Sequence, residues 1–120
     1  MAFLSVTPYL RYPDADAAAE WLSRAFGFGP AQCVRNAEGR WTEGTLQVGA
    51  GRVDLSGSGA ADRALLIIGV DDVDDLYRRI TEAGVDIDSP RDEPYGPRSC
   101  HVTDPWGYQW YFWQGDARYD

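Results

Sequence analysis

Two short stretches, Asp-Ala-Asp-Ala-Ala at residues 14–18 and Asp-Val-Asp-Asp-Leu at residues 72–76, repeat an acidic pattern at an offset of 58 positions. Each stretch opens an apolar series at helical spacing, and an aspartate in the leading position is a typical helix N-cap. Leu22 in the first series corresponds to Ile80 in the second. The chain of 120 residues therefore contains an internal repeat, with one copy in each half.

The halves meet at a flexible joint, Gly-Ser-Gly-Ala-Ala at residues 57–61. We place the two modules at about residues 1–57 and 63–120 of a single domain. Each module is predicted as one strand, one helix and three strands, which indicates an α+β fold with the helices on one sheet face. The predicted strands are residues 3–12, 31–36, 40–48, 52–56, 64–70, 85–87, 98–103 and 108–114.

Composition and charge restrict the function classes. The apolar share of 44% and the charged share of 25% are typical of a soluble globular protein, and no apolar run approaches the length of a membrane span. Nineteen acidic and eleven basic residues give a net charge of −8, which argues against nucleic acid and favours a cationic small molecule. The first residues resemble no signal peptide, so we expect a cytoplasmic protein without a membrane partner.

The nucleophile chemistry that the sequence allows is limited. All eleven basic residues are Arg, which excludes a lysine Schiff base. Cys33 and Cys100 lie 67 positions apart without a CxxC motif, so both are expected as free thiols. Cys100 and His101 are neighbours on a predicted strand and point to opposite faces, which prevents a nucleophile–base pair. We therefore predict no catalytic residue.

Five stretches together resemble one known group of proteins. Residues 95–98 (Tyr-Gly-Pro-Arg) and 104–112 (Asp-Pro-Trp-Gly-Tyr-Gln-Trp-Tyr-Phe) resemble a signature of the glyoxalase/bleomycin-resistance superfamily, also called vicinal oxygen chelate proteins. Residues 6–10, 19–22 and 25–28 resemble the same superfamily, particularly its PhnB-like single-domain members. The resemblance implies two βαβββ modules that form a curved mixed sheet around a cavity. It also implies a homodimer with the site at or near the subunit interface.

The resemblance further implies where a metal would be held. Enzymes of the superfamily bind a divalent ion with His, Glu or Gln from the first and last strands of each module. This chain has Thr7, Leu65 and Tyr111 at three of those positions, and Asp54 or Ser56 at the fourth. Because a divalent ion needs about three convergent donors, we expect neither a metal nor another cofactor.

The residues left to line such a cavity are mainly aromatic. Alternation on the last strand puts Tyr111 on one face with Gln109 and Trp113, and puts Trp110 and Phe112 under the helices. Aromatic faces stack planar ligands and attract cations. The predicted ligand-binding residues are Tyr9, Arg11, Trp41, Asp54, Tyr95, Arg98, Trp106, Tyr111 and Trp113.

Three functions remain open from the sequence. The first is a metal-free protein that binds a planar or cationic small molecule, such as an antibiotic. The second is a metal-dependent glyoxalase-like lyase, isomerase or dioxygenase that uses Asp54 and His101. The third is a structural or regulatory dimer whose cavity is filled by its own Trp side chains. Arg98 has a structural alternative as well, an ion pair with Asp92 or Asp104.

Overall fold

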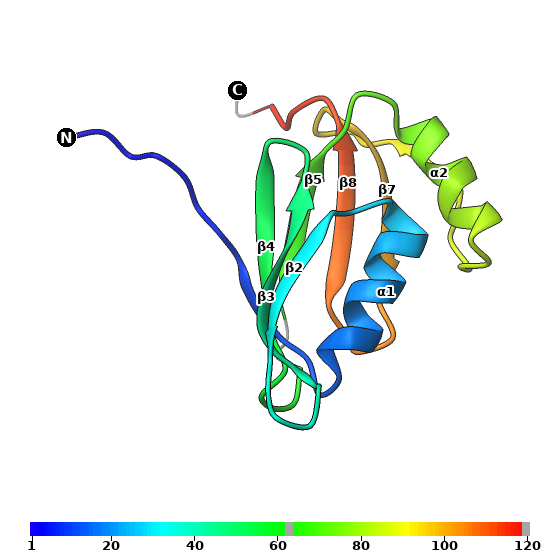
Figure 1. Ribbon diagram of the computed structural model, residues 1–120. Coiled ribbons are helices and arrows are strands. Elements are labelled where there is room, and N and C mark those ends of the chain that lie inside the picture. The colour runs from blue at the N-terminus through cyan, green and yellow to red at the C-terminus, as the bar shows by residue number, and fades with distance from the viewer. Residues whose placement is uncertain (62–63, 119–120) are drawn as a thin grey trace. The chain divides into compact units, whose positions relative to one another are not determined.

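A computed structural model describes residues 1–61 and 64–118 (Figure 1). The chain divides into two compact units, Met1–Asp62 and Arg63–Asp120. The first unit contains β1 (Tyr9–Arg11), α1 (Ala15–Phe26), β2 (Ala31–Arg35), β3 (Trp41–Val48) and β4 (Gly51–Ser56). The second unit contains β5 (Leu65–Gly69), α2 (Val73–Glu82), β6 (Arg91–Asp92), β7 (Arg98–Thr103) and β8 (Gln109–Gln114). Both units follow the order βαβββ, which confirms the predicted α+β class and its repeated module.

Each unit forms one four-stranded mixed sheet. The strand order is β1-β4-β3-β2 in the first unit and β5-β8-β7-β6 in the second, so the two modules share one topology. In both, the first strand of the module lies parallel to the last, and the remaining pairs are antiparallel. The connection between these two parallel strands contains the helix and the two other strands of the module, which is long enough for the crossover that a parallel pair requires.

The helix ends follow the capping signals in the sequence. The side chain of Asp14 accepts a hydrogen bond from the Ala17 backbone N–H at 3.0 Å. Asp72 caps α2 in the same way, through the Asp75 N–H at 3.0 Å. Gly27 ends α1 in the left-handed conformation at a φ of 80°, where glycine is favoured.

The second acidic residue of each repeat anchors its helix to its sheet. Asp16 on α1 pairs with Arg35 of β2 at 2.8 Å and accepts the backbone N–H of Trp41 at 3.2 Å. Asp74, 58 positions later, accepts two hydrogen bonds from the guanidinium of Arg98 on β7, at 2.9 and 3.0 Å. The repeated acidic pattern is therefore a structural device in both units, in addition to favourable charge at the helix N-termini.

Each sheet buries the face that carries its helix. In the first sheet the buried side chains on this face include Leu10, Leu46, Val53 and Leu55. In the second sheet they include Leu66, Cys100, Val102, Trp110 and Phe112. The prediction that Trp110 and Phe112 lie on the helix side is confirmed, because both are at most 1% exposed in the layer against α2.

A buried carboxylate organises the turn between β7 and β8. Asp104 is 3% exposed and accepts hydrogen bonds from the backbone N–H groups of Trp106 and Tyr108, at 3.0 and 3.1 Å. Its second oxygen accepts the indole N–H of Trp110 at 3.0 Å. The Asp-Pro-Trp-Gly stretch is thus a turn whose acid also orients a core tryptophan.

Two predicted strands differ from the structure. The strand predicted at residues 3–12 contains only β1, because Pro8 has no N–H to donate, and the residues before it are strongly exposed, with Phe3 at 95%. Residues 85–87 form no strand, since the Val85 N–H bonds to the Ile80 carbonyl at the end of α2. A two-residue strand, β6, forms instead at Arg91–Asp92, between the strands predicted at residues 85–87 and 98–103.

The helices are short. Within the described ranges, none is long and apolar enough to cross a bilayer.

Candidate ligand-binding site

Each sheet has a second face, which its own helix does not cover. We call these the first and second helix-free faces. The first helix-free face is formed by Tyr9, Arg11, Gln32, Val34, Glu43, Thr45, Arg52 and Asp54. The second helix-free face is formed by Leu65, Ile67, Ser99, His101, Thr103, Gln109, Tyr111 and Trp113.

The first helix-free face carries a row of hydrogen-bonding groups. Tyr9 lies opposite Asp54, Asp54 lies opposite Thr45, and Thr45 lies opposite Gln32. The row crosses all four strands at right angles and presents a phenol, a carboxylate, a hydroxyl and an amide in sequence. Such a row can recognise a ligand with several polar groups.

Two carboxylates on this face have different partners. Glu43 accepts the Tyr9 hydroxyl at both of its oxygens, at 2.7 and 2.9 Å. Asp54 forms an ion pair with Arg52, whose Nε lies 3.3 Å from Oδ1. That Oδ1 is buried and accepts no hydrogen bond from any described group, since the Arg52 contact lacks hydrogen-bond geometry. Asp54 therefore keeps an acceptor that is not satisfied.

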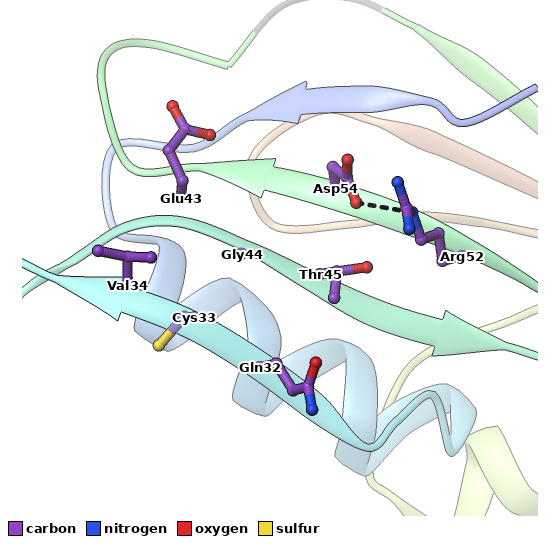
Figure 2. A pocket seen from close by; sticks show the side chains of 8 residues that line it. All are labelled: Gln32, Cys33, Val34, Glu43, Gly44, Thr45, Arg52 and Asp54. Atoms are coloured by element: carbon purple, nitrogen blue, oxygen red, sulfur yellow. Dashed lines mark ion pairs between the residues drawn. The ribbon is translucent and has the colours of Figure 1, made fainter.

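These side chains surround a depression of about 420 Å³ in the first unit. Figure 2 shows Asp54 and Arg52 joined by their ion pair, with Thr45 on the neighbouring strand and Glu43 further along it. The residues that line the depression are Gln32, Cys33, Val34, Glu43, Gly44, Thr45, Arg52 and Asp54. All of these lining residues belong to the first unit.

The second helix-free face is aromatic. The rings of His101 and Tyr111 are stacked, with centroids 4.4 Å apart and an interplanar angle of 22°. Tyr95 lies against Trp113, with centroids 5.9 Å apart and an angle of 55°. The indole N–H of Trp113 is buried and has no acceptor among the described residues. The face thus combines flat apolar surfaces with one unused donor.

A smaller polar pocket of about 180 Å³ adjoins the stacked pair. Its wall contains Glu93, which accepts hydrogen bonds from Arg91 at 2.9 Å and from the Ser99 hydroxyl at 2.8 Å. These bonds, first of all the one from Arg91, hold the pKa of Glu93 below its ordinary value. The Glu93 carboxylate therefore links Arg91 of β6 to Ser99 of β7.

Six of the nine predicted ligand-binding residues lie on or against the helix-free faces: Tyr9, Arg11 and Asp54 in the first unit, and Tyr95, Tyr111 and Trp113 in the second. Trp41 lies on the other side of its sheet. It is 6% exposed, and its indole N–H donates to the Leu55 carbonyl at 3.0 Å. Its ring occupies the space that a side chain at Gly44 would need.

Arg98 and Trp106 also lie away from these faces. Arg98 pairs with Asp74 on α2 and, at 3.3 Å, with Asp92, which is one of the structural pairings that the sequence left open. Trp106 belongs to the turn that Asp104 organises. Of the nine predicted residues, three thus remain candidates on the first helix-free face and three on or against the second.

Sequence reasoning did not assign Glu43, Thr45 and Gln32 to the site. All three follow from alternation once Asp54 is placed, because the strand pairing puts them on its face. The missing information was the register between β2, β3 and β4, which no short sequence signal specifies. The sequence suggests His101 as a group of an enzyme alternative together with Asp54, and the structure shows its ring stacked on Tyr111.

The residues at the superfamily's metal positions do not fit a divalent ion. Leu65 offers no donor atom, Thr7 offers a neutral hydroxyl, and the Tyr111 ring is stacked on an imidazole. Over residues 1–61 and 64–118, no three His, Cys, Asp or Glu side chains converge as a metal centre requires.

Comparison with known proteins agrees with this architecture. Residues 4–112 match the family model of the Glyoxalase/Bleomycin resistance protein/Dioxygenase superfamily, and the chain belongs to that superfamily. Among solved structures, TioX from Micromonospora sp. ML1 is 31% identical, with a TM-score of 0.80 over 95% of this chain and 100% of TioX. A search of curated proteins found no match.

Two more distant structures share the fold. A glyoxalase-related enzyme from Clostridium phytofermentans is 19% identical, with a TM-score of 0.83 over 97% of this chain and 98% of the enzyme. TnmS3, an antibiotic binding protein from Streptomyces sp. CB03234, is 22% identical, with a TM-score of 0.71 over 97% of this chain and 100% of TnmS3. One fold is thus shared by a protein described as a glyoxalase-related enzyme and by one described as an antibiotic binding protein.

Proposed function

We propose that this chain is a metal-free small-molecule-binding protein that holds a planar or cationic ligand of the antibiotic type. The observation that carries the proposal is the aromatic second helix-free face, where Tyr111 stacks on His101 and Trp113 contacts Tyr95. Tyr111 and Trp113 are half-buried, whereas His101 and Tyr95 are exposed. Flat rings of this kind add about 0.5–1.5 kcal/mol per stacked contact. The buried, unused N–H of Trp113 gives a ligand acceptor a partner.

Charge and donor chemistry support the same function. The net charge of −8 attracts cations over a distance, which raises their local concentration. The metal positions hold Thr7, Leu65 and Tyr111, which suit contact with an organic ligand better than ligation of an ion. The structural likeness to an antibiotic binding protein is an analogy of fold, and it is consistent with this reading.

We also propose that the protein acts as a homodimer in the cytoplasm. Apolar side chains are strongly exposed before β1 and on β5, namely Phe3, Leu4, Val6, Leu65 and Ile67. Exposed apolar groups in such number commonly mark an interaction surface. Both cysteines are free, which suits a reducing compartment.

The proposal is tested by titrating the purified protein with proflavine, a planar cation, in the presence and absence of EDTA. We expect quenching of Trp fluorescence that saturates and does not depend on the chelator. Tyr111→Leu removes one stacking ring and should weaken binding about tenfold, as expected for a contact of this size. Tyr77→Leu, on α2, is the matched control and should leave binding unchanged.

Two results would favour the other functions. About one tightly retained divalent ion per chain, needed for binding, would support a lyase, isomerase or dioxygenase. A chain that stays dimeric but binds no member of a panel of planar compounds would support a structural or regulatory dimer.

A further inference from the structure

We infer that the depression on the first helix-free face is a subsite for a protonated amine, with Asp54 as its counter-ion. The inference rests on the proposed function only in that the chain binds a small molecule. It adds the chemical class of one ligand group and the residues that receive it.

The first argument is the unsatisfied acceptor. Oδ1 of Asp54 is buried and accepts no hydrogen bond from any described group. A buried acceptor without a donor is costly, and most such atoms in folded proteins have a partner. A ligand N–H that enters the depression supplies the missing donor, and a positively charged N–H makes the stronger bond.

The second argument is the weakness of the present partner. Arg52 lies two residues before Asp54 on β4, and its side chain is 56% exposed, against 29% for Asp54. Exposed ion pairs of this kind contribute little free energy, so the arginine can move into solvent at small cost. The Arg52 guanidinium lies beside Asp54 without donating a hydrogen bond to Oδ1. Arg52 would therefore compete with a ligand cation for the Asp54 carboxylate.

The third argument is what lies beside Asp54. Thr45 and Gln32 continue the row across the sheet with a hydroxyl and an amide, so a second polar group on the ligand finds partners. Glu43 accepts the hydrogen bond of the Tyr9 phenol, and it stands diagonally across from Asp54 on the same face. Two carboxylates at one depression of about 420 Å³ favour a cation over an anion.

The test uses benzylamine, which is protonated at pH 7, and benzyl alcohol as its neutral isostere. Amide shifts of the ¹⁵N-labelled chain report binding residue by residue. We expect benzylamine to shift the amides of Thr45 and Asp54 in a saturable and salt-sensitive way. Benzyl alcohol should shift them at least fivefold less at the same concentration.

Two variants with opposite expected effects sharpen the test. Asp54→Asn keeps the shape of the side chain and removes its charge, and it should weaken benzylamine binding at least fivefold. Arg52→Gln removes the competitor and should strengthen binding severalfold. The same spectra show whether each variant is folded. Thr81→Val on α2 serves as a control that should bind like the parent chain.

Three results would overturn the inference: equal binding of the amine and the alcohol, no loss in Asp54→Asn, or stronger shifts at these amides with benzoate than with benzylamine. These failures differ from failure of the proposed function. If proflavine does not quench Trp fluorescence while benzylamine still binds at Asp54, the aromatic site is wrong and the amine subsite stands. If proflavine binds and benzylamine does not, the reverse holds.

Discussion

The two sheets share one strand order and differ in the face that their helices leave uncovered. The first presents a polar row that includes Tyr9, Asp54 and Thr45. The second presents aromatic and aliphatic side chains, among them Tyr111 and Ile67. The helix-covered faces, by contrast, are apolar in both. Alternate residues of each strand thus build the apolar core under the helix, and the residues between them are available to bind a ligand.

The largest effect that we expect on the free energy of unfolding comes from replacing Asp104. This acid has no counterpart in the first unit, because the residue 58 positions earlier is Leu46. Asp104→Ala leaves the indole N–H of Trp110 and two turn N–H groups without their acceptor. We expect a loss of about 3–5 kcal/mol in the free energy of unfolding, measured by urea denaturation. A loss below about 1 kcal/mol would show that water replaces the carboxylate.

Glycine on the two sheets provides the next contrast. A Cβ at Gly44 would collide with the Trp41 ring and the Gln32 carbonyl, whereas a Cβ at Gly69 meets nothing within 4 Å. Gly44→Ala should therefore destabilise the chain by about 1–3 kcal/mol. Gly69→Ala is the matched control and should change the unfolding free energy by less than about 0.5 kcal/mol. Equal effects at the two positions would contradict the placement of Trp41.

The two helix anchors predict a shared pH dependence. Hydrogen bonds from Arg35 and Arg98 lower the pKa values of Asp16 and Asp74, respectively, below the ordinary value of 3.8. When the folded-state pKa of a carboxyl is lowered, its stabilisation is fully present above the ordinary, unfolded-state pKa and is lost as the pH falls through the folded-state pKa. Asp16→Asn and Asp74→Asn should each flatten the acid side of the stability curve, in chemical denaturation at a series of pH values.

Because the two anchors belong to different units, the double variant should show the sum of the two single effects. A strongly non-additive result would mean that the Asp16–Arg35 and Asp74–Arg98 ion pairs are energetically coupled. Asp88→Asn, on the loop after α2, is a control at which no such change is expected.

The last expected difference is in the rate at which the two thiols are alkylated, and it involves no change in the free energy of unfolding. Cys100 is buried, and burial raises its pKa to about 11, whereas Cys33 is partly exposed. At pH 8 the thiolate fraction of Cys100 is on the order of 0.1%, so iodoacetamide should label Cys33 first. Mass spectrometry of Cys33→Ser should show almost no labelling until denaturant is added. Rapid labelling of that variant would place Cys100 at the surface.

Much of the fold was predictable because its signals are local. The capping residues Asp14 and Asp72 and the terminating Gly27 depend only on neighbouring backbone groups. The repeat offset of 58 residues indicated two modules, and alternation on the last strand separated Trp110 from Tyr111 correctly. These features depend on interactions between residues close together in the chain, so the local sequence is enough to predict them.

The irregularities of the sheets were not predictable in this way. Trp41 was counted among the ligand-binding residues as an aromatic residue at the start of a predicted strand, and simple alternation would put it on the same side as Glu43. The pairing of β2 with β3 shifts register between Val34 and Arg35, where Val34 lies opposite Glu43 and Arg35 lies opposite Trp41. The extra residue turns Trp41 to the helix side, where the missing side chain of Gly44 leaves room for its ring.

Local patterns in the sequence predict the two βαβββ modules and the N-termini of their helices, and they show that no His, Glu or Gln stands at the superfamily's metal positions. The tertiary structure, by contrast, sets which polar residues share a face, because register depends on contacts between strands distant in the chain. It also decided that Arg98 serves Asp74, an acid 24 positions away, and that Asp54 keeps a buried oxygen without a donor. Such outcomes depend on long-range pairing, which no local pattern encodes.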